Sequence, residues 1–129
     1  MNRRALLAAP LALAATPALA SGGGGSSSTN TYIRYPTITA NTFQADGRRG
    51  VMTVETGVDV PDAALRLRAQ QSEPRVRAVF NILVQREAAT LLPGQPPNVD
   101  RLSRQFQSAM NIILRQRGAR LLLGTVMVV

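Results

Sequence analysis

The stretch VMTVETGVDV, residues 51–60, decides the fold of this chain. Every second position points to one side, which places five residues on a common face: Met52, Val54, Thr56, Val58 and Val60. Thr53, Glu55 and Asp59 fall on the opposite face. A period of two is typical of a strand with one buried and one solvated face. We therefore expect an antiparallel sheet with its core on one side.

The residues before this strand predict a hairpin partner. Residues 32–43 are rich in Thr, Ile and Tyr, which favours a strand. Pro36 lies inside it, and proline cannot donate to a ladder, so we expect an edge strand or a bulge there. The segment ADGRRG, residues 45–50, has the glycines of a turn. The two strands should form a hairpin.

Helices are predicted after the hairpin. Pro61 and Asp62 favour a helix start, and we expect a short helix over residues 62–71. The segment Ser72-Glu73-Pro74 should break or kink it, with Ser72 available as a new N-cap. From Arg75 to Leu92 the apolar residues recur at helical spacing: Val76, Val79, Phe80, Leu83, Val84 and Leu91.

The last third of the chain predicts one more helix and one more strand. After a proline-rich loop at residues 93–97, Asn98 should cap a helix that ends at Gly118. Residues 119–129 form an apolar run without alternation, which favours a central strand that is screened on both faces or covered by a partner. The expected fold is α+β in the order β-β-α-α-β, a small mostly antiparallel sheet with helices packed on one face. The order of the strands stays open.

The N-terminus has the order of an export signal. Asn2-Arg3-Arg4 is a positive start, an alanine-rich apolar run follows, and Ala18-Leu19-Ala20 supplies the small residues of a cleavage site. We expect Met1 to Ala20 to be a signal peptide that is cleaved after Ala20, which makes the mature protein exported and periplasmic. The arginine pair also resembles a twin-arginine signal. Residues 21–31, rich in Gly and Ser, should be a flexible linker before a domain over residues 32–129.

The composition excludes most catalytic sites. The chain has no histidine and no cysteine, so Ser-His-Asp, Cys-His and His-zinc sites are impossible. Glu55 and Asp59 share a strand face but lie ~13 Å apart by the rise of a strand, beyond the ~5–9.5 Å of glycosidase carboxylates. There is no run of calcium ligands and no phosphate-binding loop. We expect no enzyme activity, no cofactor and no metal.

The charge favours anionic partners. The formal net charge is +8, and every basic residue is arginine. Such a surface favours an anionic envelope component, whereas an exported chain should not meet nucleic acid. Arg48 and Arg49 should stand at the hairpin tip, exposed and unpaired by nearby acids. They are the first candidates for partner binding, and a merely solvated turn is the alternative.

The order of these segments resembles the FliL-like proteins of the flagellar basal body. The resemblance covers residues 32–129 and rests on the turn at 46–49, the strand end Val58-Asp59-Val60-Pro61-Asp62, the segment Pro74-Arg75-Val76-Arg77 and the terminal strand Gly124-Thr125-Val126-Met127-Val128-Val129. It implies a non-enzymatic interaction or assembly domain of the flagellar basal body or cell envelope, with a protein partner or self-association. The family's members look like single-span inner-membrane proteins, whereas we expect this chain to have a cleavable signal. The alternative function is a basic periplasmic binding protein that captures an anionic envelope component.

Overall fold

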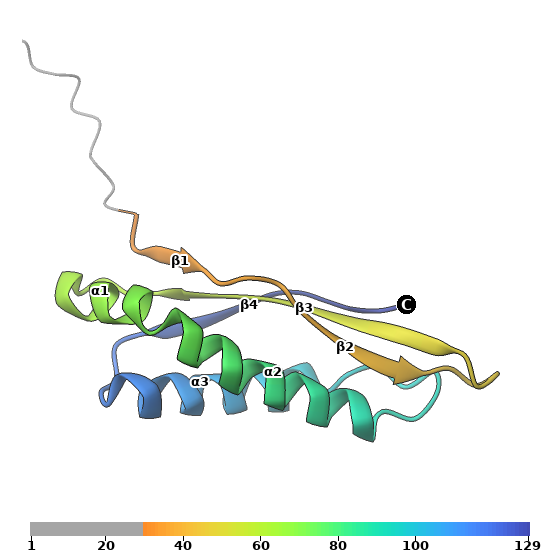
Figure 1. The fold of residues 1–129 in the computed structure, drawn as a ribbon. Coiled ribbons are helices and arrows are strands. Elements are labelled where there is room, and N and C mark those ends of the chain that lie inside the picture. Colours follow the sequence, from red (N-terminus) through yellow and green to blue (C-terminus); the bar gives the residue numbers. More distant parts are fainter. Residues whose placement is uncertain (1–29) are drawn as a thin grey trace, which may run out of the picture.

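Residues 30–129 are described in a computed structural model. They form an α+β domain in which helices cover one face of a four-stranded antiparallel sheet (Figure 1). The expected fold class is therefore confirmed. The expected signal peptide and nearly all of the expected linker lie outside the described residues.

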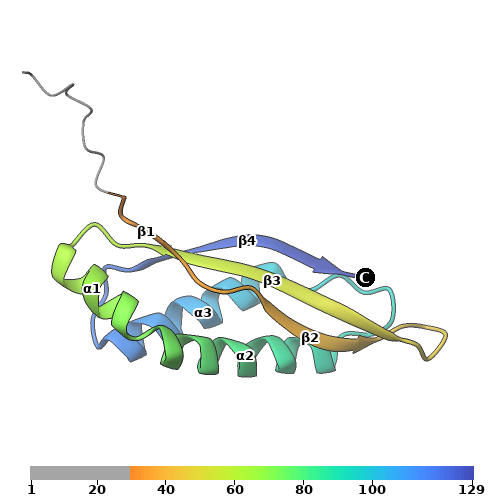
Figure 2. The ribbon, with the colours of Figure 1, turned by 45° about the horizontal axis from the view of Figure 1, so that its top comes forward.

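The long strand β3, Arg49–Asp59, is the centre of the sheet. It pairs with β1, Tyr32–Arg34, and β2, Ile38–Phe43, on one side, and with β4, Arg120–Val128, on the other (Figure 2). The predicted hairpin is thus present between β2 and β3. The prediction of a central terminal strand was wrong, because β4 pairs with β3 alone within residues 30–129.

Pro36 divides the first predicted strand in two. The residues around it leave the ladder, so β1 and β2 follow one another along the same side of β3. Between them the Tyr35 N–H still reaches the Thr56 carbonyl at 3.0 Å. Because a proline has no N–H to donate, its position at this edge costs the sheet no hydrogen bond. The expectation of an edge strand is confirmed.

Three helices follow, α1 at Ala63–Gln71, α2 at Glu73–Thr90 and α3 at Val99–Leu114. The predicted break separates α1 from α2 at Ser72, whose side chain makes no capping hydrogen bond. Asp62 and Asn98 do cap their helices, accepting from the N–H groups of Leu65 at 2.8 Å and Arg101 at 3.0 Å. The order of elements is therefore β-β-β-α-α-α-β.

The end predicted for α3 at Gly118 was wrong. The helix stops at Leu114, and Arg115 takes the left-handed conformation with φ 56°. The Arg68 guanidinium donates to the Leu114 carbonyl, which supplies a partner for a group that the helix leaves open. The left-handed residue that ends α3 is thus an arginine, where a glycine is usual, and a hydrogen bond from α1 accompanies it.

The core lies between the sheet and the helices. The predicted inner face of β3 is fully buried, from Met52 to Val60 at alternate positions. Opposite it, Phe80 of α2 and Phe106 of α3 stack with ring centroids 4.3 Å apart. The other apolar side chains of α2 and α3 that are at most 1% exposed are Val76, Val84, Leu102, Met110 and Leu114. No helix of residues 30–129 lies on the opposite face of the sheet (Figure 1).

Candidate interaction surfaces

The outer edge of β4 is an unprotected strand edge. Val51 and Val129 exchange both main-chain hydrogen bonds, at 2.8 and 3.0 Å. Because bonded and non-bonded pairs alternate in an antiparallel ladder, Val126 and Val128, which lie opposite Val54 and Met52, turn their N–H and C=O groups outward. No partner for these groups is present within residues 30–129. The edge is therefore free to form a further ladder.

A bulge interrupts β4 near its middle. Val54 pairs with Val126 and Thr56 pairs with Leu123, so two residues of β4, Gly124 and Thr125, lie opposite the single residue Glu55. Side chains that point toward the helices belong to odd-numbered residues before the bulge and to even-numbered residues after it, because the extra residue changes the alternation by one. Outward main-chain groups therefore fall at 121 and 123 before the bulge and at 126 and 128 after it.

A glutamine of α3 occupies the first position of this edge. The Leu121 N–H donates to Gln107 Oε1 at 2.8 Å, and Gln107 Nε2 donates to the Ala119 carbonyl, also at 2.8 Å. A primary amide thus makes the pair of contacts that a neighbouring strand would make. The role of Gln107 could not be predicted from the sequence, because the spacing of polar residues on an amphipathic helix does not show which group each of them contacts.

Apolar side chains border the same edge on the face without helices. Val51, Met127 and Val129 are exposed there, and Leu122 is half-buried. The acidic residues of this face are engaged in structural contacts. Glu55 forms an ion pair with Arg34 at 3.0 Å, and Asp59 accepts a hydrogen bond from the Thr31 hydroxyl. Each of the two carboxylates therefore has a structural partner among the described residues.

The hairpin tip differs from the expectation in one respect. Arg48 is paired, because its Nε lies 3.3 Å from Asp46 Oδ2 and its N–H donates to Asp46 Oδ1. The prediction that it is unpaired by nearby acids was therefore wrong: the turn that exposes Arg48 also returns the chain toward Asp46. Arg49 begins β3 opposite Phe43 and has no carboxylate within 4.0 Å among the described residues.

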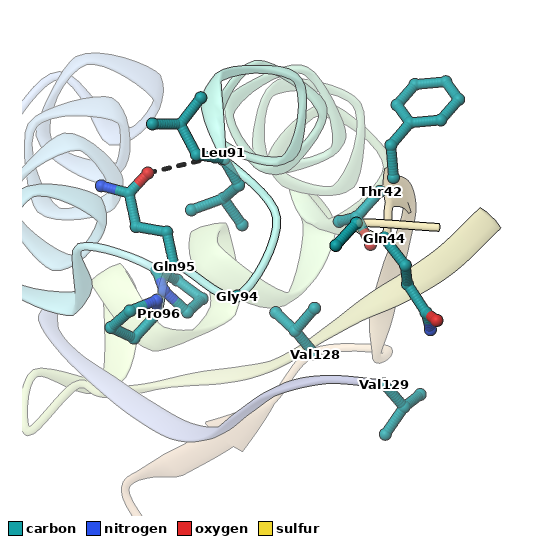
Figure 3. Close-up of a pocket in the computed structure, with 12 residues that line it drawn as sticks. Thr42, Gln44, Leu91, Gly94, Gln95, Pro96, Val128 and Val129 are labelled. Carbon is teal, nitrogen blue, oxygen red and sulfur yellow. Dashed lines mark hydrogen bonds between the residues drawn. The ribbon is translucent and has the colours of Figure 1, made fainter. Parts of the chain in front are cut away.

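A pocket of about 380 Å³ opens where the hairpin, the α2–α3 loop and the end of β4 meet (Figure 3). Leu91, Pro96 and Val128 approach it from the loop and the strand. The loop is held by Gln95, whose Oε1 accepts from the Leu92 N–H at 3.1 Å. Thr42 also lines the pocket, and its buried hydroxyl has no partner among the described residues. The lining is apolar apart from a few polar groups.

Glu87 is a buried carboxylate with a structural role. Its Oε1 accepts from the Asn98 N–H at 3.0 Å, and its Oε2 forms an ion pair with Arg101 at 2.6 Å. These contacts fasten the end of α2 to the start of α3. Within residues 30–129 no group of three His, Cys, Asp or Glu residues is close enough to hold a metal.

The comparisons with known proteins name no family. No model of a protein family matches the chain, and no curated protein is significantly similar to it. No helix among residues 30–129 has both the length and the apolar character needed to cross a membrane.

Proposed function

We propose that this domain is a non-enzymatic interaction module of the cell envelope that binds another polypeptide by strand addition at the outer edge of β4. The observation that carries the proposal is the edge itself, which is apolar and contains no charged residue from Leu121 to Val129. Exposed main-chain groups in such a strand give affinity for an extended segment, and adjacent side chains give selectivity.

The contrast between the two edges of the sheet supports a binding role for β4. On the β1–β2 side, Pro36 has no main-chain N–H to donate, and Arg34 carries a charged side chain that is 66% exposed. Proline and charge are common protections of edge strands against pairing. The β4 edge has neither between Leu121 and Val129, and Gln107 covers only its first position. One edge is thus protected, and the other is left open.

The cellular setting of the proposal comes from the sequence. The N-terminal signal favours export to the periplasm, and the order of segments resembles the FliL-like domain, which implies assembly at the flagellar basal body or elsewhere in the envelope.

Site-specific photo-crosslinking in the native host tests the proposal. A photoreactive residue replaces Met127, which is exposed beside β4, and a matched variant carries it at Thr39 on the opposite edge. We expect defined protein adducts from position 127 and none from position 39. Equal yields at the two positions, or no adduct at 127, would contradict strand addition at β4.

A second candidate function is the capture of an anionic envelope component. Only Arg34, Arg48 and Arg101 have a carboxylate within 4.0 Å among the described residues. The other arginines of residues 30–129, including Arg49 at the hairpin tip, leave an excess of positive charge at the surface. Co-sedimentation with anionic-lipid vesicles but not with neutral ones, lost as salt is raised, would support this function. Equal retention by both vesicles would exclude it.

A further inference from the structure

We infer that the strand that occupies the β4 edge is β4 of a second copy of this chain, related by a two-fold axis between Gly124 and Thr125. The inference rests on the proposed function and names the partner. This pairing of two β4 strands would join the two four-stranded sheets into one continuous sheet, with the helices of both copies on the same face.

The bulge makes β4 self-complementary about its midpoint. In antiparallel pairing about this axis, Leu123 lies opposite Val126 of the copy, and Leu121 lies opposite Val128. The ladder with β3 turns the main-chain groups of all four residues outward. The axis therefore brings outward-facing donors and acceptors together, and of these the Leu121 N–H is already bonded to Gln107 Oε1. If the register shifted by one residue, the outward N–H and C=O groups of one copy would lie opposite N–H and C=O groups of the other copy that are already bonded to β3.

The same register matches the side chains. It places Leu122 opposite Met127 of the copy in a non-hydrogen-bonded pair, on the face without helices. Both side chains are apolar, and Met127 is 47% exposed in the single chain. Cross-strand apolar pairs stabilise antiparallel sheets, and their side chains approach closest in non-hydrogen-bonded pairs. Two such pairs flank the axis.

Electrostatics favour this edge over other surfaces of the chain for self-association. A formal net charge of +8 makes two copies repel one another wherever arginines face arginines. Arg120 is the only charged residue of β4, and in the paired strands it lies opposite residue 129 of the copy. The two Arg120 side chains are then roughly 30 Å apart by the rise of a strand, beyond the ~8 Å range of screened charges.

Gln107 shows that the edge accepts an amide in the required position. Its Oε1 holds the Leu121 N–H at 2.8 Å, where the register places the Val128 carbonyl of the copy. Pairing at Leu123 and Val126 does not disturb this contact. Only when the ladder extends to the outer pair, Leu121 and Val128 of the copy, does the Leu121 N–H exchange Gln107 Oε1 for the Val128 carbonyl of the copy. The central hydrogen bonds therefore form without loss of an existing one.

Disulfide trapping tests the register, because the chain has no native cysteine. Leu122→Cys and Met127→Cys are made as separate single variants of the full protein. Opposite residues of a non-hydrogen-bonded pair have Cα atoms about 4.5 Å apart, within the ~4.4–6.8 Å of a disulfide. Two copies of position 127 lie about 17 Å apart in this register. We expect a disulfide-linked dimer when the two variants are mixed under mild oxidation, and none from either variant alone.

Sedimentation equilibrium of the unmodified protein accompanies the trapping. We expect a concentration-dependent dimer that Val128→Pro weakens at least tenfold, because that proline removes an outward N–H. Proline at the opposite edge, Asn41→Pro, should leave the dimer intact. Circular dichroism establishes that both variants are folded. A monomer at all concentrations without a trapped dimer in the mixture, or trapping from each variant alone, would overturn the inference. Photo-crosslinking of position 127 to a different protein would then leave strand addition at β4 standing.

Discussion

The ring of Tyr32 lies over Gly57, in the space that a β-carbon on residue 57 would occupy. The two residues belong to β1 and β3, which pair at this end of the sheet. Gly57 is buried by this contact even though it faces away from the helices. A glycine inside a strand often marks such a close approach, and a covering aromatic ring compensates for its missing side chain.

The first prediction concerns this contact. Gly57→Ala should lower the free energy of unfolding by about 1 kcal/mol, because the new methyl group displaces Tyr32 and its packing is lost. In a Tyr32→Ala background the same change should be neutral or stabilising, because alanine restricts the unfolded chain more than glycine does. Urea unfolding of the four proteins measures both effects. Equal destabilisation in the two backgrounds would show that Tyr32 is not the obstacle.

The buried carboxylate of Glu87 should matter more than an exposed one. Glu87→Ala leaves the Asn98 N–H and Arg101 without their acceptor and should cost roughly 2–3 kcal/mol of unfolding free energy. Glu87→Gln keeps an oxygen acceptor and should cost less. Glu55→Ala breaks the exposed ion pair with Arg34 and should cost about 0–1 kcal/mol. Similar losses for Glu87→Ala and Glu55→Ala in chemical denaturation would contradict the role assigned to Glu87.

Stability should fall in alkaline solution because of Tyr35. Burial, and to a lesser extent the charge of Glu73, raises the pKa of Tyr35 to about 12, while its hydroxyl donates to the Ala69 carbonyl at 3.2 Å. The unfolded tyrosine has a pKa of about 10. The folded state holds the Tyr35 proton more tightly than the unfolded state does. The contribution of Tyr35 to the free energy of unfolding is therefore complete below pH ~10 and is lost as the pH rises toward ~12. Unfolding free energies measured across this range should decline less steeply for Tyr35→Phe. Parallel declines would contradict the prediction.

A buried threonine should be replaceable with a gain in stability. Thr56 lies on the inner face of β3, 1% exposed, and its hydroxyl has no partner among residues 30–129. Thr56→Val keeps the shape and removes a polar group that burial penalises, so it should raise the unfolding free energy by about 1 kcal/mol. Thr53→Val on the opposite face serves as the control and should change little. A loss of stability in thermal denaturation of Thr56→Val would mean that the hydroxyl is satisfied.

The local sequence determined the elements and the buried face of this protein. Alternation over residues 51–60 predicted both faces of β3, because side chains of a strand point to opposite sides in turn. Pro36 and Asn98 act through their own main chain or their immediate neighbours. For this reason the edge position of the first strand and the cap of α3 could be predicted without knowledge of the rest of the fold, whereas the division of that strand into β1 and β2 was not predicted.

Only the tertiary structure decided what each surface faces. Residues 119–129 are apolar enough for a central strand, yet β1 and β2 share one side of β3 and leave β4 the other, so β4 became an edge. Arg68 reaches the end of α3, and Gln107 reaches the edge of β4, from distant parts of the sequence. The candidate binding edge could not be predicted from the sequence, because strand order depends on contacts between segments, whereas periodicity reports only which side of each segment is buried.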